Sequence, residues 1–242
     1  MGNFYQLNEI TLITVAGVNI ESAANALLIS SEFFKFGSIK LLSPTKPLLL
    51  HNTIEHIQIL PMDFMGYQKF KIEELYKFVD TKFCLCIEPD GFVINPQLWT
   101  NEFLQYDYIG APWPNFVKVN NGPVDKFYFG KNRVGNSGFS LRSKKLLEVC
   151  AKIKFDELNF WIKSEDLIIC YFLYEQMLKA GIKFATLDLA SKFSIESQVE
   201  NQPNSLESSF GFHGKRWLSN YYLKELAIKS NYSREYSSLL LS

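Results

Sequence analysis

The sequence predicts an α/β fold in which a mixed, mostly parallel central sheet is flanked by helices. The first observation is a strand, turn, helix and strand pattern within residues 10–42, a unit that normally builds a parallel sheet with a right-handed crossover. The second is the wholly apolar run at 83–87, which is typical of an interior strand covered on both faces. The third is composition: 47% of the 242 residues are hydrophobic and 15% are aromatic, enough for a sizeable core.

Apolar spacing gives the elements of the first half of the chain. We expect a strand at 10–15, a helix at 19–36 stopped by Gly37, strands at 38–42 and 54–60, a loop at 64–67, a helix at 71–79 and a strand at 82–87. The turn after the first strand, at Ala16 and Gly17, lacks the repeated glycines of a dinucleotide fingerprint or a phosphate loop. These two modes of nucleotide binding are therefore disfavoured.

The second half contains more glycine, proline and polar residues between its elements. We expect a strand at 107–112, a surface loop at 115–131 that covers a ligand, and a turn and strand at 134–142. Helices are expected at 143–153 and at 167–178, with Gly181 as the stop of the second. A strand at 183–187, a polar loop at 194–209 and a last helix at 217–226 complete the chain. Long polar loops of this kind are often functional.

Charge and cysteine usage argue against several classes of protein. The 25 basic and 25 acidic residues balance, so no overall field attracts nucleic acid. The N-terminus has no signal-peptide pattern and no apolar run is long enough to span a bilayer, which predicts a soluble, cytoplasmic protein. Peripheral membrane contact and the oligomeric state stay open. The four cysteines lie in apolar stretches and have no zinc-site spacing, so we interpret them as core residues.

The segment Glu88-Pro89-Asp90 is the leading candidate for a site. It follows directly after the buried strand, and ligands of open α/β sheets bind outside the carboxyl ends of the strands. Two carboxylates there suit a divalent cation or a sugar. A polar turn between two strands explains the same residues, so other segments have to decide between these interpretations.

Three later segments carry further candidate residues. Two glycines flank Asn136 and Ser137 and let the backbone approach a substrate closely, although a plain turn fits as well. Glu165 and Asp166 follow Ser164 at a predicted helix start, where they suit both helix capping and general base catalysis. His213 lies between glycines and aromatic residues; a single histidine is more often structural than a metal ligand.

In this order, the four segments resemble the GT-A fold of nucleotide-sugar-dependent glycosyltransferases. That fold has an acidic motif for a metal and a diphosphate, a glycine-rich loop, an acidic pair that supplies the base, and a late metal-binding histidine. The strings DYIGAPW (107–113), VGNSGFSLRS (134–143) and GFHG (211–214), with Glu165-Asp166, resemble more closely a little-characterised group of small glycosyltransferase-like domains of microbes and viruses. The resemblance covers roughly residues 80 to 215.

The resemblance implies a nucleotide-sugar donor, with UDP-sugar favoured, a Mn²⁺ or Mg²⁺ cofactor, and a glycan or glycoconjugate acceptor. It assigns the metal to Asp90 and His213 with Glu88, the general base of an inverting reaction to Asp166, an orienting role to Glu165, the nucleoside to Ala16 and Val18, and sugar contacts to Gly138, Trp113 and Phe212. Glu88 stands where the wider fold usually has Asp. Direct ligation, ligation through water and contact with the ribose all stay open for it.

The resemblance also implies one catalytic domain over residues 1–242, with a nucleotide-binding half at 1–90, a sugar and acceptor half at 91–215, and a C-terminal helix and tail at 216–242. Two alternatives remain. One is a non-catalytic nucleotide-sugar or carbohydrate-binding module of the same fold. The other is a sugar nucleotidyltransferase, which normally needs a glycine-rich, basic first loop that residues 16–19 do not provide. A retaining reaction also stays open.

Overall fold

A computed structural model describes residues 5–118 and 123–222. Its strands are β1 (Tyr5–Val15), β2 (Phe34–Ser43), β3 (Glu55–Gln58), β4 (Phe83–Ile87), β5 (Tyr108–Ile109), β6 (Ala111–Pro112), β7 (Phe116–Lys118), β8 (Lys126–Tyr128), β9 (Val134–Gly135), β10 (Phe139–Ser143), β11 (Ser194–Ile195) and β12 (Gly211–Phe212). Its α-helices include α1 (Ile20–Ser31), α2 (Phe64–Glu73), α3 (Lys144–Cys150), α4 (Glu165–Leu167), α5 (Tyr174–Lys179) and α6 (Leu187–Phe193). None of the helices in these two ranges is long and apolar enough to cross a membrane.

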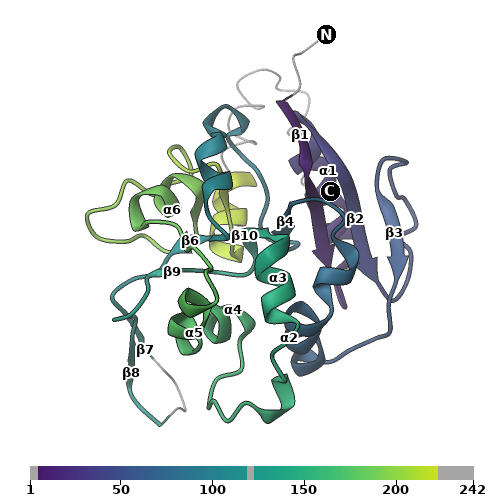
Figure 1. The fold of residues 1–242 in the computed structure, drawn as a ribbon. Coiled ribbons are helices and arrows are strands. Elements are labelled where there is room, and N and C mark those ends of the chain that lie inside the picture. The colour runs from purple at the N-terminus through teal and green to yellow at the C-terminus, as the bar shows by residue number, and fades with distance from the viewer. Residues whose placement is uncertain (1–4, 119–122, 223–242) are drawn as a thin grey trace.

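The central sheet has the strand order β3-β2-β1-β4-β10-β5. Strand β1 pairs in parallel with β2 and β4, and β2 pairs in parallel with β3, whereas β10 is antiparallel to both of its neighbours. Figure 1 shows β1 to β3 on one side of the molecule and helices against the sheet. The predicted fold class, a mixed and mostly parallel sheet flanked by helices, is confirmed. The sheet draws strands from both predicted halves of the chain.

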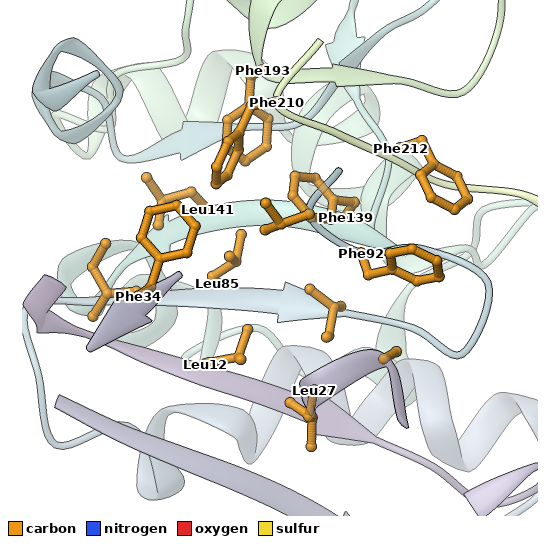
Figure 2. Packing of buried hydrophobic residues seen from close by; sticks show 14 of the residues in the cluster. Leu12, Leu27, Phe34, Leu85, Phe92, Phe139, Leu141, Phe193, Phe210 and Phe212 are labelled. Atoms are coloured by element: carbon orange, nitrogen blue, oxygen red, sulfur yellow. The ribbon is translucent and has the colours of Figure 1, made fainter. Parts of the chain in front are cut away.

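Alternation along the strands buries both faces of the sheet. On one face Leu12 and Leu85 pack with Leu27 of α1, as Figure 2 shows. On the other face Ile13 and Cys84 belong to a cluster with Leu147 of α3. The molecule therefore has three layers, and the predicted core role of the four cysteines agrees with their burial as free thiols.

Aromatic packing fixes the C-terminal segment on the first face. Phe139 of β10 has its ring centroid 5.2 Å from that of Phe193, and Phe34 lies 5.8 Å from Phe210 by the same measure. Figure 2 shows Phe193 and Phe210 packed over Phe34 and Phe139 of the sheet. Strand β12 follows Phe210 directly, and His213 is the first residue after β12. The packing of Phe210 therefore determines where His213 is held.

The boundary between α1 and β2 differs from the prediction. The helix ends at Ser31, and residues 34–36 already belong to β2 instead of to a helix reaching residue 36. Gly37 does not stop the helix; it lies inside the strand, where an added Cβ would come 2.3 Å from the backbone oxygen of Asn8. The glycine is needed because β1 and β2 approach closely there.

We expect Gly37→Ala to lower the free energy of unfolding by about 1–3 kcal/mol, since the new methyl group overlaps backbone that cannot yield easily. Urea denaturation of the two proteins measures the difference. Gly130→Ala is the matched control, because a Cβ at Gly130 meets nothing within 4 Å. Equal midpoints for both variants would contradict this account of Gly37.

Four other elements also differ from the prediction. Residues 64–67 are not a loop but the start of α2, whose N-cap Asp63 accepts a hydrogen bond from the amide of Gly66. The predicted helix at 71–79 is instead the end of α2 and a short 3₁₀ helix at Leu75–Phe78. The loop at 115–131 contains the hairpin β7–β8, and the strand expected at 183–187 is only a bridge at Phe184 before α6.

The helix expected at 167–178 is divided into α4, a π-helical turn at Ile168–Phe172 and α5, which ends before Gly181 with its positive φ of 76°. The last predicted helix is described over residues 215–222 only. The remainder of the predicted C-terminal helix and tail, residues 223–242, lies outside the described ranges.

Candidate functional site

The end of β4 and the end of β12 bring two carboxylates and an imidazole together. After Glu88 the chain reverses, with the Gly91 amide donating to the Glu88 carbonyl oxygen at 3.0 Å. The Gly214 amide then donates to the carbonyl oxygen of Asp90 at 2.9 Å, which joins the two strand ends. His213 Nε2 lies 3.5 Å from Glu88 Oε2 and 3.5 Å from Asp90 Oδ1.

Glycines make this approach feasible. A Cβ on Gly138 would lie 2.1 Å from Cδ2 of the His213 ring, and a Cβ on Gly91 would lie 2.8 Å from the carbonyl oxygen of Phe212. Gly138 therefore has a steric role in placing His213. Gly138 does not line the cavity of about 940 Å³ into which His213 faces, although the resemblance implied a sugar contact for this glycine.

The cluster has the donor set of a hard divalent cation. One ligand atom from each of Glu88, Asp90 and His213 lies within 4.8 Å of the other two. Carboxylate oxygen and imidazole nitrogen suit Mn²⁺, and carboxylates also bind Mg²⁺. His213 Nδ1 lies 3.2 Å from Glu196 Oε1, a second contact that orients the ring as outer carboxylates do in metal sites. The residues present fit a Mn²⁺ or Mg²⁺ ion.

The electrostatics of the cluster also favour binding of a divalent cation. Burial opposes a charged imidazole, yet hydrogen bonds to Asp90, Glu196 and Glu88 raise the pKa of His213 well above its ordinary value. Three carboxylates thus surround one imidazole. A field that holds a proton this strongly also attracts a divalent cation.

Two residues of α2 hold Glu88 by one of its oxygens. Tyr67 donates its hydroxyl to Glu88 Oε1 at 2.7 Å, and Lys71 Nζ lies 3.3 Å from the same oxygen. The other oxygen faces His213. Burial opposes ionisation of Glu88, but Lys71, His213 and Tyr67 hold its pKa well below the usual range. Sequence reasoning assigned no role to Tyr67 or Lys71.

A buried ion-pair network lies next to Lys71 and Glu88. Glu165 is fully buried; Oε1 accepts a hydrogen bond from Arg142 Nη1 and Oε2 lies 3.7 Å from Lys71 Nζ. The backbone amide of Glu165 donates to Gln68 Oε1 at 2.7 Å. Glu165 does not line the cavity, so its carboxylate is placed to orient α4 rather than to touch an acceptor. Arg142, also fully buried, was not assigned a role from the sequence.

Asp166 points the other way, into the cavity. Its Oδ1 accepts hydrogen bonds from the Ser164 hydroxyl and the Leu167 amide, both at 2.8 Å. Ser164 makes no side-chain cap to the helix, unlike the N-cap expected from the sequence. Burial first, and then the charge of Glu165, raise the pKa of Asp166 to about 6. A carboxylate of this pKa suits a general base near neutral pH.

One cavity of about 940 Å³ joins these groups. Among the residues predicted for the site, those that line it are Ala16, Val18, Glu88, Asp90, Asp166 and His213. Tyr67, Gln68 and Glu196 line it as well, and polar character was the only feature of these residues that could have pointed to a site.

The two predicted aromatic sugar contacts lie in the core instead. The Trp113 ring packs 4.6 Å from that of Phe129 and fills the space beside Gly135. Phe212 is fully buried, with its ring centroid 4.7 Å from that of Phe92. Neither ring lines the cavity. Both rings pack in the core in this structure, and the packing of Trp113 accounts for Gly135 beside it.

We expect His213→Ala to weaken Mn²⁺ binding by at least about tenfold, because the change removes the only nitrogen donor of the cluster. Isothermal titration of the full chain with Mn²⁺ measures the affinity. His56→Ala is the matched control, since His56 hydrogen-bonds Ser43 outside the cavity. Unchanged affinity in His213→Ala would contradict a metal role for this residue.

Comparison with known proteins finds one matching family and several solved structures of low sequence identity. Residues 60–213, more than half of the chain, match the family described as "Protein of unknown function (DUF5672)". No curated protein matches the chain.

Solved structures that resemble the chain include two sugar-transferring enzymes. One is a glycosyltransferase involved in the glycosylation of the major capsid of PBCV-1, at 12% identity and a TM-score of 0.45 over 85% of this chain and 92% of that one. Another is galactosyltransferase LgtC in complex with donor and acceptor sugar analogues, at 14% identity and a TM-score of 0.47 over 85% of this chain and 87% of that one.

Proposed function

Since the chain belongs to the family described as "Protein of unknown function (DUF5672)", which names no activity, we propose from its site that it is a metal-dependent glycosyltransferase of GT-A type. The observation that carries the proposal is the shared cavity: the Glu88, Asp90 and His213 cluster and Asp166 all line the same space of about 940 Å³. A nucleotide-sugar donor, with UDP-sugar favoured, would bind between them and transfer its sugar to a glycan or glycoconjugate hydroxyl.

Asp90 and His213 would hold the cation, with Glu88 Oε2 as the third donor. When bound, a divalent cation neutralises negative charge that develops on a leaving diphosphate. Tyr67 and Lys71 keep Glu88 Oε1 occupied, so they present Oε2 in a fixed direction. We therefore favour direct ligation by Glu88 over contact with the ribose.

Asp166 would accept the proton of the acceptor hydroxyl as that oxygen attacks the anomeric carbon. Attack from the face opposite the leaving diphosphate inverts the configuration of the sugar. The raised pKa of Asp166 supports this role, because a base near pKa 6 is ionised at neutral pH yet still takes up a proton readily. Ala16 and Val18, which line the cavity after β1, would border the nucleoside.

A panel of UDP-, GDP- and dTDP-sugars with Mn²⁺ tests the proposal. Thermal shift measures donor binding, and release of the nucleotide diphosphate measures turnover. We expect one class of donor to raise the melting temperature only when Mn²⁺ is present, and to be hydrolysed slowly. Binding without turnover in the presence of candidate acceptors would identify a binding module instead. No shift and no turnover in a folded sample would reject the proposal.

A further inference from the structure

Gln68 is a buried polar residue of α2 whose side chain lines the cavity. The residue is 4% exposed, and its buried neighbours on the same helix are Lys71 and Ile72. Lys71 is explained by its ion pairs with Glu88 and Glu165. Burial of a side-chain amide costs free energy unless both of its ends are hydrogen-bonded. An account of Gln68 therefore has to cover both its oxygen and its nitrogen.

The oxygen of this amide has a partner within the protein. The backbone amide of Glu165 donates to Gln68 Oε1 at 2.7 Å, and since a backbone N–H can only donate, this contact fixes which end of the side chain is the oxygen. Nε2 makes no hydrogen bond to another described residue. It is also not one of the fully buried atoms without a partner, so it remains open to the cavity that Gln68 lines.

Gln68 connects the two ends of the proposed site. The residue before it, Tyr67, donates its hydroxyl to Glu88 Oε1 at 2.7 Å, next to the metal cluster. The oxygen of Gln68 holds Glu165, the residue before the base Asp166. In the proposed function, the transferred sugar lies between the diphosphate at the metal and the acceptor at Asp166. Nε2 is therefore placed to donate hydrogen bonds to that sugar.

The charge of the cavity disfavours an acidic sugar. Among the described residues that line it, one lysine, Lys215, and the imidazole of His213 face five carboxylates. The carboxylates belong to Asp63, Glu88, Asp90, Asp166 and Glu196. A carboxylate on the transferred sugar would be repelled by them, whereas the hydroxyl groups of an uncharged sugar can accept a hydrogen bond from a neutral amide.

We propose that Gln68 determines specificity for the donor, because its Nε2 recognises a hydroxyl group of the transferred sugar, and that this sugar is an uncharged hexose. The inference rests on the proposed function, since it assigns a ligand to the same cavity. A site with a fixed donor rejects an analogue that lacks the hydroxyl, because the buried amide then has no partner.

Deoxy sugars test this recognition in the wild-type protein. The probes are the hexosyl donor that the panel identifies, its monodeoxy and monodeoxyfluoro analogues, and the counterpart with a carboxylate at C6. We expect one deoxy position to lower kcat/KM by at least about tenfold, with a smaller loss for fluorine at that position, because fluorine can accept a hydrogen bond. The C6 carboxylate should also lower kcat/KM by at least about tenfold.

Two variants assign the recognition to Gln68. In Gln68→Met, which has a similar size and no N–H donor, the normal and the deoxy donor should have almost equal kcat/KM. Gln68→Glu keeps an oxygen for the Glu165 amide, but its ionised carboxylate can only accept hydrogen bonds. The advantage of the fluoro over the deoxy donor should therefore disappear. Gln176→Met, an exposed change on α5 outside the cavity, is the matched control and should keep the wild-type preference.

The results separate this inference from the proposed function. If no donor binds or reacts with the folded protein, the proposed function itself fails. If a donor reacts but no deoxy position matters, if a folded Gln68 variant keeps the wild-type preference, or if the C6 carboxylate donor reacts best, only the inference about Gln68 is overturned. The ratio of two donors within one variant does not change when a substitution merely reduces the amount of active protein, and melting temperatures show whether each variant is folded.

Discussion

Replacing Asp166 with asparagine is expected to lower kcat by about 10²–10⁴-fold, while the affinity for the nucleotide-sugar changes little. Asparagine keeps the size of the side chain and an oxygen that can accept the hydrogen bonds from Ser164 and Leu167, but it cannot take up the acceptor proton. Steady-state rates with the donor identified by the panel measure kcat, and thermal shift measures donor binding.

The pH dependence of kcat in the wild-type protein tests the role of Asp166 independently. Because the pKa of Asp166 is raised to about 6, the base is protonated below this pH and ionised above it, so kcat should rise with pH through about 6 and then level off. Asp188→Asn, an exposed change in the first turn of α6, should leave both the rate and the profile unchanged. A flat profile, or an Asp166→Asn enzyme with wild-type kcat, would exclude the base role.

The sheet could be predicted because its strands carry strong apolar patterns. The run at 83–87 reads as a buried strand from composition alone, and it became β4 at the centre of the sheet. The end of α1 could not be predicted in the same way. Phe34 continues the helical spacing of Ala23 and Leu27 but also begins a strand alternation with Phe36, and only pairing with β1 decides between the two.

Helix α2 was partly missed for a reason connected with the site. Its buried face includes Gln68 and Lys71, which are polar because they contact Glu165 and Glu88. A helix that buries polar residues loses the apolar stripe by which helices are recognised. The error in the fold prediction and the missed site residues thus have one physical cause.

Glu88, Asp90 and His213, the candidate metal ligands, could be proposed from their order along the chain, whereas the residues that support them could not. Glu196 lies in a polar segment in which no residue stands out, and only the fold places it on His213 Nδ1. Trp113 and Phe212 were interpreted as sugar contacts because aromatic residues beside glycines suit both stacking and packing. Their burial against neighbouring rings favours packing.

The largest expected effect on stability is at Glu165. Replacing it with leucine should lower the free energy of unfolding by about 3–5 kcal/mol, because the fully buried Arg142 guanidinium then loses its carboxylate partner. Urea denaturation with the linear extrapolation measures this change. Lys154→Met removes one partner of the exposed pair with Glu157 and should leave the midpoint almost unchanged.

The double variant Arg142→Met/Glu165→Leu separates stability from function. Arg142 Nη2 has no hydrogen-bond partner among the described residues, so the pair is incompletely satisfied, and apolar replacements of both partners should recover most of the lost stability. Recovery of the melting temperature with a lowered kcat would show that the pair orients α4, and with it Asp166, instead of holding the fold together. A Glu165→Leu protein as stable as the wild type would contradict the buried network itself, because an unpaired guanidinium cannot remain buried without cost.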